Sequence, residues 1–259
     1  MLQIIKSYLT FLWESKNEHG VHSPFVFNLV TKCFYDKKKY SEYSILNNYR
    51  NSLLANKNKM EVTDFGVGSR VFKSNSRAIN QIAKNAGISA KRAELLFRIV
   101  NYFQPENILE IGTSLGLATS ALSLGNMKAK ITTLEGCPET SSVTKKQFEE
   151  FKFENVEFVV SEFSEYLKNF VFPTSYFKLI YFDGNHSKQA TIDYFEILLP
   201  TITNESIWIF DDIHWSPSME DAWEIIKNHP KVTVTIDTFQ WGIVFFRNEQ
   251  LRENFVIRV

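Results

Sequence analysis

Two short clusters of acids and histidines contain the residues best suited to carry out chemistry. The stretch YFDGNHS contains Asp183 and His186, and the stretch IFDDIHW contains Asp211, Asp212 and His214. A histidine can remove a proton near neutral pH, because its unperturbed pKa is about 6.5. Carboxylate oxygens are also the ligands that hard divalent cations such as Mg²⁺ prefer. The clusters therefore predict a site for proton transfer, for metal binding, or for both.

A glycine loop lies upstream of both clusters. In ILEIGTSLG, Glu110 precedes Gly112, and Gly116 follows four positions later. Glycines let a chain turn sharply and let a ligand approach the backbone closely. The loop lacks the GxGxxG pattern, which argues against a dinucleotide pyrophosphate and leaves an NAD-dependent oxidoreductase as a weak alternative.

An acidic residue follows this loop at a distance typical of nucleotide-binding sites. Glu135 comes 25 residues after Glu110 and ends the next strand-like run. A carboxylate at that point can accept hydrogen bonds from both hydroxyls of a ribose. We therefore expect Glu135 to bind the ribose of a nucleoside cofactor.

A parallel sheet is needed to bring these residues together. From residue 105 onward, strand-like and helix-like runs alternate, which is typical of a mainly parallel sheet with helices on both faces. Only a very short connection separates the last two strands, so that pair should be an antiparallel hairpin. Ligands bind at the carboxyl edge of such sheets. Seven strands are predicted, at 107–111, 130–135, 156–160, 177–183, 206–212, 232–239 and 241–246.

The strand count, the final hairpin and ILEIGTSLG resemble the class I S-adenosylmethionine-dependent methyltransferases over residues 90–259. The resemblance implies a Rossmann-like α/β fold with S-adenosylmethionine as cofactor. Glu110 would help to hold its methionine end, and Glu135 its ribose. The other positions that the resemblance places near the cofactor are Gly112, Thr113, Ser114, Gly116, Gly136, Cys137, Ser161, Glu162, Phe163 and Asp183.

The acid clusters are similar to those of catechol O-methyltransferase and its bacterial relatives. Asp183 and Asp211 match aspartates of that group, and Asp212 replaces an asparagine. The resemblance implies O-methylation of a small molecule, with Mg²⁺ or another divalent cation at these three residues. The loop DGNHSKQATIDYF departs from that group and is closer to methyltransferases whose fourth strand ends in Asp-Gly-x-His. His186 or His214 acting as a metal-free general base is therefore the alternative.

The first 92 residues differ from the rest in charge. They hold 15 basic and 6 acidic residues, whereas the remainder holds 14 and 23. Helices are predicted in the first dozen residues, from Ser23 onward with Pro24 at the first helical position, and over 74–103 with a break at 87–89. The stretch 47–60 is polar. We expect residues 1–92 to form a helical extension or lid over a core of 93–259.

The N-terminal region is also expected to contribute to the acceptor pocket. DFGVGSR, at 64–70, has two glycines and is predicted to close over the site as a lid. Trp215, Trp241 and the aromatic residues of 25–43 are candidates for lining the pocket, although core packing is the commoner role for such side chains.

Other classes of function stay open at this point. The basic N-terminal region could hold RNA as a methylation substrate. The segment INQIAKNAGISAKRAELLFRIV has the outline of a helix-turn-helix DNA reader, but its second helix is largely apolar, so we expect that helix to be buried. A catalytically inactive relative that only binds or scaffolds is a further alternative.

Composition indicates a protein of the cytoplasm. Cys33 and Cys137 have no metal-like or redox-like spacing, and the chain opens without a signal-peptide pattern. No run approaches the roughly 18 apolar residues that span a bilayer. We expect a small-molecule partner and no membrane, and the sequence leaves a homodimer open.

Overall fold

The computed structural model describes residues 2–63, 74–169 and 177–259, and its centre is an eight-stranded sheet. The strand order is β10-β8-β9-β7-β6-β3-β4-β5. β9 is antiparallel to its neighbours β7 and β8, and the other pairs are parallel. The Rossmann-like sheet with its antiparallel hairpin is thus confirmed. The strands are β3 (Asn107–Ile111), β4 (Lys130–Glu135), β5 (Val156–Val160), β6 (Leu179–Phe182), β7 (Ile207–Asp211), β8 (Val234–Asp237), β9 (Trp241–Phe245) and β10 (Glu253–Val256).

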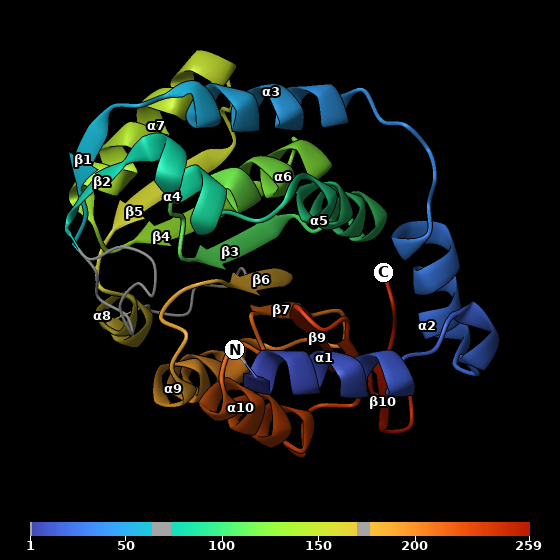
Figure 1. Cartoon of the computed structure of the whole chain (residues 1–259). Coiled ribbons are helices and arrows are strands. Elements are labelled where there is room, and N and C mark those ends of the chain that lie inside the picture. The colour runs from blue at the N-terminus through green and yellow to red at the C-terminus, as the bar shows by residue number, and fades with distance from the viewer. Residues whose placement is uncertain (1, 64–73, 170–176) are drawn as a thin grey trace.

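Helices cover both faces of this sheet (Figure 1). Successive strand residues point to opposite faces. Ile108 and Tyr181 accordingly join the buried cluster that includes α5 and α6, whereas Leu109 and Phe182 join the cluster that includes α9 and α10. On the first face lie α3 (Glu42–Ala55), α4 (Ile79–Asn85), α5 (Ala90–Phe103), α6 (Leu117–Gly125) and α7 (Pro138–Phe151); on the second lie α8 (Phe163–Asn169), α9 (Lys188–Leu198), the short η3 (Leu199–Thr201) and α10 (Pro217–Lys227).

The N-terminal helices pack on the core. α1 (Leu2–Glu14) lies beside α10, where the Gln3 side-chain amide donates to Glu220 at 2.8 Å. η1 (Glu18–Gly20) leads to α2 (Pro24–Leu29), which Ser23 caps as predicted and which continues as the π-helical turn η2 (Val30–Phe34). Residues of α2 and α5 share one buried cluster. The division at residue 92 stays a prediction. Within the described ranges, no helix is long and apolar enough to cross a bilayer.

Three elements differ from the sequence predictions. Much of the polar stretch 47–60 belongs to α3, which buries Leu46, Tyr49 and Leu53 at helical spacing. Residues predicted to begin a helix at Ser74 instead form β2 (Ser76–Ala78), antiparallel to β1 (Lys59–Glu61). The helix begins only at Ile79.

The third difference is β10, which the sequence did not predict. It lies at the sheet edge, parallel to β8, and Phe255 is its one buried residue. A half-exposed strand of four residues has too little apolar alternation to be recognised from sequence.

The strand order reverses between β3 and β6. From β3 the chain goes outward to β4 and β5, and it then returns to place β6 on the other side of β3. At the carboxyl edge, the loops that follow β3 and β6 run in opposite directions and leave a crevice between them. Open α/β sheets usually bind their ligands in this crevice. The glycine loop and Asp183 both follow strands at this point.

Candidate active site

The loop between β3 and α6 runs against the end of β6. Gly112 has a φ of +104°, and a Cβ atom there would lie 2.4 Å from the carbonyl oxygen of Asp183. Gly116 has a φ of +71°, and a Cβ atom there would lie 2.5 Å from the Phe148 ring. Both backbone conformation and space therefore require glycine. The structure thus brings the predicted loop and Asp183 together.

Glu135, at the end of β4, is held by two backbone donors. Its Oε2 accepts from the Ser114 amide at 2.8 Å, and its Oε1 accepts from the Cys137 amide at 2.9 Å. These two bonds fix the orientation of the carboxylate at the strand end. The side chain is half-buried, next to Gly136 and beside the glycine loop. This position fits a ribose ligand.

Glu110 lies inside the sheet and is fully buried. Its Oε2 accepts from the hydroxyls of Thr119 and Thr133 at 2.6 Å and 2.5 Å, and Thr133 also bonds Thr113. Burial raises the pKa of Glu110 to about 8, although both hydroxyl bonds lower it. Its Oε1 has no hydrogen-bond partner among the described residues. Glu110 therefore supports the loop from beneath, and its contact with a cofactor stays a prediction.

The three residues after β5 have different environments. Glu162 is exposed, and its carboxylate accepts from the Glu165 amide at 2.8 Å, near the start of α8. Burial raises the pKa of Glu162, but hydrogen bonds from the amides of Glu165 and Ser164 lower it by more, so the pKa lies below its usual value. Phe163 reaches the loop after β6, because its ring would meet a Cβ atom on Gly184 at 2.4 Å. Ser161 bonds the Glu162 carbonyl. Of the three, Phe163 comes nearest to the glycine loop and Asp183.

Asp183 and His186 lie together in the loop after β6. The His186 Nε2 is 3.6 Å from the Asp183 Oδ1, and both side chains are mostly buried. Burial raises the pKa of Asp183 well above its usual value, and the charges of Asp211 and Asp212 raise it further. Asp183 is therefore a weaker acid than an exposed aspartate, with an imidazole beside it.

Asp211, at the end of β7, is paired with an arginine that the sequence did not single out for this site. The Arg92 guanidinium bonds the Asp211 Oδ1, which also accepts from the Asp212 amide at 2.8 Å. The Tyr181 hydroxyl donates to Oδ2 at 3.3 Å. Burial lowers the pKa of Arg92, but the negative charges around it, chiefly that of Asp211, raise the pKa by more. The guanidinium also lies over the Trp241 ring, 4.9 Å from the centroid.

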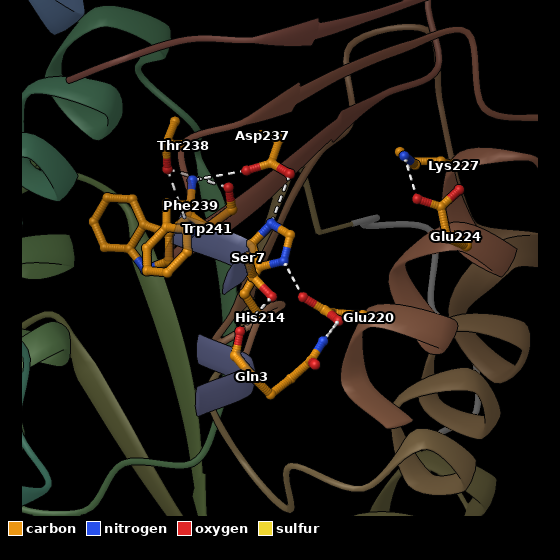
Figure 2. Close-up of polar contacts among 10 residues, drawn as sticks. All are labelled: Gln3, Ser7, His214, Glu220, Glu224, Lys227, Asp237, Thr238, Phe239 and Trp241. Atoms are coloured by element: carbon orange, nitrogen blue, oxygen red, sulfur yellow. Dashed lines mark hydrogen bonds and ion pairs between the residues drawn. The ribbon is translucent and has the colours of Figure 1, made fainter. Parts of the chain in front are cut away.

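His214 lies apart from this pair, between two other carboxylates (Figure 2). Its Nδ1 is 2.9 Å from Glu220 and its Nε2 is 2.9 Å from Asp237, while the ring stacks on Phe239. Burial lowers the pKa of His214, but the bonds and charges of Asp237 and Glu220 outweigh burial and raise it. Both ring nitrogens are thus engaged, and the same Glu220 binds Gln3 of α1.

A small pocket opens over the glycine loop. Thr113, Ser114 and Asp183 are among its lining residues. Other lining residues come from α4 and the turn before α5, which the sequence did not assign to the site. They are Ile82, Ala83, Ala86, Gly87 and Ile88.

Most of the aromatic candidates pack in the core. Phe25 contacts Phe245, and Tyr40 contacts Phe97. Trp241 is buried over Arg92, whereas Trp215 is half-buried beside the site residues. The four candidates Phe25, Tyr40, Trp215 and Trp241 are not among the residues that line the pocket beside Asp183. Core packing is therefore the role of most aromatic residues at 25–43.

The helix-turn-helix interpretation is not supported. The apolar residues of α5 are buried, and Arg98 donates to the Cys33 and Phe34 carbonyl oxygens at 2.9 Å and 3.2 Å. A helix whose arginines bind its own protein has little left with which to read DNA. DFGVGSR, the predicted lid at 64–70, lies outside the described residues.

Solved structures with the same fold include several methyltransferases. A methyltransferase of Podospora anserina bound to S-adenosylhomocysteine aligns with a TM-score of 0.60 at 14% identity, over 88% of this chain and 97% of that one. An O-methyltransferase of Streptomyces achromogenes involved in tomaymycin synthesis, in complex with S-adenosylmethionine, gives 0.59 at 15% identity over 82% and 92%. An O-methyltransferase of Bacillus cereus in complex with S-adenosylhomocysteine gives 0.56 at 18% identity over 82% and 94%. No curated protein sequence matches the chain.

The sheet, its strand order and these neighbours define the fold as that of the S-adenosylmethionine-dependent methyltransferases. Residues 109–213 match the model of a family described as a methyltransferase domain. That match begins within β3, before the glycine loop, and ends just after the Asp211-Asp212 pair. The chain therefore contains a segment that matches a methyltransferase domain, on the fold that the sequence resemblance implied.

Proposed function

We propose that this protein transfers a methyl group from S-adenosylmethionine to a hydroxyl oxygen of a small molecule. The observation that carries the proposal is the junction of β3 and β6. There the Gly112 backbone, the Asp183 backbone and the pocket lined by Thr113 and Ser114 occur together.

The residues at this junction fit the cofactor. Gly112 and Gly116 adopt positive φ angles in the loop whose residues Thr113 and Ser114 line the pocket, and the amides of Ser114 and Cys137 orient Glu135 at the next strand end. When bound, S-adenosylmethionine supplies a methyl group on a positively charged sulfur, which needs no further activation. We assign Glu135 to the ribose and Thr113 and Ser114 to the methionine portion.

The acceptor must lose a proton as its oxygen forms the new bond to carbon. The carbon–sulfur bond breaks at the same time, and its electron pair stays on sulfur. We propose that His186 accepts this proton. Its imidazole lies next to Asp183, and an imidazole nitrogen can act as a general base. His214 is the weaker candidate, since both of its nitrogens bind carboxylates.

The divalent cation expected at Asp183, Asp211 and Asp212 fits this donor set poorly. Both carboxylate oxygens of Asp211 already accept hydrogen bonds. Oδ1 accepts from the Arg92 guanidinium, and Oδ2 accepts from the Tyr181 hydroxyl. We therefore write the reaction without a metal step. The neighbours in the fold include O-methyltransferases, and this supports oxygen over nitrogen as the acceptor atom.

The test is transfer of a labelled methyl group from S-adenosylmethionine to a panel of phenols, catechols and aromatic amines. We expect the label on hydroxyl oxygen of at least one member. His186→Ala should reduce the rate by about 10²–10⁴-fold, as for loss of a general base. His19→Ala, at an exposed histidine far from the glycine loop in sequence, is the matched control. Label on amines alone would contradict the oxygen assignment, and an unchanged rate in His186→Ala would contradict the base.

A further inference from the structure

The carboxylate cluster at the sheet edge already contains a fixed cation. Arg92, near the start of α5, reaches across to the end of β7 and binds Asp211. The arginine side chain is mostly buried, and one of its faces lies over the Trp241 ring. A guanidinium stays charged at any pH at which a protein is folded. Its positive charge is thus a permanent part of this site.

The lone pairs of Asp211 are directed at protein donors. Arg92 and the Asp212 amide share Oδ1, and the Tyr181 hydroxyl takes Oδ2. A metal ligand must turn an oxygen lone pair toward the ion. Such an ion would also lie close to the guanidinium, and two positive charges that near each other in a buried site repel strongly.

The arrangement of the other acids is consistent with this. In the part of the chain that the structure describes, no group of three or more histidines, cysteines or acids is placed to hold a metal ion. Asp183 lies close to Asp211 and 3.6 Å from the His186 Nε2, and Asp212 follows Asp211 with a φ of +55°.

We propose that the Arg92 guanidinium takes the place of a divalent cation at this edge of the sheet. It is a positioning residue: through Asp211 it fixes the end of β7 beside Asp183 and offsets the negative charge of the cluster. The site consequently binds no metal, and methyl transfer proceeds without one. The last statement rests on the proposed function, whereas the absence of metal binding does not.

The test uses Mn²⁺ as the probe, with its electron paramagnetic resonance signal as the readout, in the full chain without cofactor or acceptor. We expect the wild-type protein to leave the free Mn²⁺ signal unchanged. Binding of one equivalent that Asp211→Asn removes would overturn the proposal. This measurement needs no activity, so it is independent of whether the proposed reaction is correct.

A pair of variants tests the role of the guanidinium itself. Arg92→Met removes the charge and keeps much of the side-chain length, and we expect it to gain Mn²⁺ binding. Arg92→Lys keeps a positive charge and should gain none. If a folded Arg92→Met protein binds no more Mn²⁺ than Arg92→Lys, the guanidinium is not what excludes the ion. If Arg92→Met does not fold, the wild-type titration alone decides.

The third readout is activity, measured with any acceptor found for the wild-type protein. We expect the same methyl-transfer rate with a chelator and with added Mg²⁺. Loss of activity in the chelator, restored by Mg²⁺, would overturn the proposal and leave the methyltransferase assignment standing.

Discussion

In the proposed function, Glu135 is the residue that binds the ribose of the cofactor. Its carboxylate is oriented by the amides of Ser114 and Cys137. Glu135→Ala removes an ionised acceptor, and hydrogen bonds to charged groups contribute about 1.5–3 kcal/mol. We therefore predict that this variant binds S-adenosylmethionine about 10- to 100-fold more weakly, as measured by calorimetric titration.

The matched control for Glu135 is Glu150→Ala, at an exposed acid of α7. It should leave the affinity unchanged. Glu135→Gln keeps one acceptor oxygen and should fall between the wild-type protein and Glu135→Ala. Wild-type affinity in Glu135→Ala would show that the ribose lies elsewhere.

The backbone of the glycine loop has little tolerance for a side chain. Gly112→Ala would place a Cβ atom 2.4 Å from a backbone oxygen at a φ of +104°. We predict a loss of about 1–3 kcal/mol in the free energy of unfolding, measured from the urea midpoint. Gly20→Ala meets only the flexible Lys16 side chain, at 2.9 Å, and is the control. Equal midpoints for the two variants would argue against a strained loop.

At the scale of elements, His214 connects the loop after β7 to α10 and β8. Glu220 and Asp237 raise the pKa of His214 above 6.5 against the effect of burial. A group with a raised pKa in the folded state stabilises the protein fully below its unfolded pKa, and this stabilisation is lost as the pH rises through the folded pKa. We predict that His214→Gln costs about 1–3 kcal/mol at pH 6 and less at higher pH, in urea titrations at each pH.

Exposed His19 provides the comparison for His214, because its ring lies at the surface, 3.6 Å from Glu18. His19→Gln should have little effect on the free energy of unfolding at either pH. A cost for His214→Gln that grows with pH would contradict the double ion pair that Figure 2 shows.

α1 is attached to the core by one side only. Phe11 is buried and packs on Phe239, whereas Trp13 on the same helix is 91% exposed. Replacing a buried phenylalanine by alanine typically costs about 3–5 kcal/mol. We predict a destabilisation of that size for Phe11→Ala, and a change within about 0.5 kcal/mol for Trp13→Ala, by urea denaturation. Similar stabilities for both variants would mean that α1 is not an integral part of the fold.

At the scale of the whole molecule, the sequence predicted the sheet better than the parts that complete the site. The seven strands were recognisable because strands buried on both faces are nearly continuous apolar runs, as in β6 and β7. The bounds of α3 were not predicted, because its three buried residues stand among asparagines and serines. β10 was missed because most of it is exposed.

The site shows the same division. The glycine loop and Glu135 could be predicted because strand ends and spacing locate them in any sheet of this kind. The partner of Asp211 could not be predicted, because Arg92 lies 119 residues away in the sequence and only the packing of α5 brings it to the end of β7. The sequence likewise gave no sign that His214 is held between Glu220 and Asp237, which come from α10 and β8.

The most direct measurement is calorimetric titration of the full chain with S-adenosylmethionine, with NAD as the comparison ligand. If the junction of β3 and β6 is the cofactor site, S-adenosylmethionine binds in a one-to-one complex with micromolar affinity and NAD does not bind. Absence of S-adenosylmethionine binding, or tighter binding of NAD, would contradict the central claim.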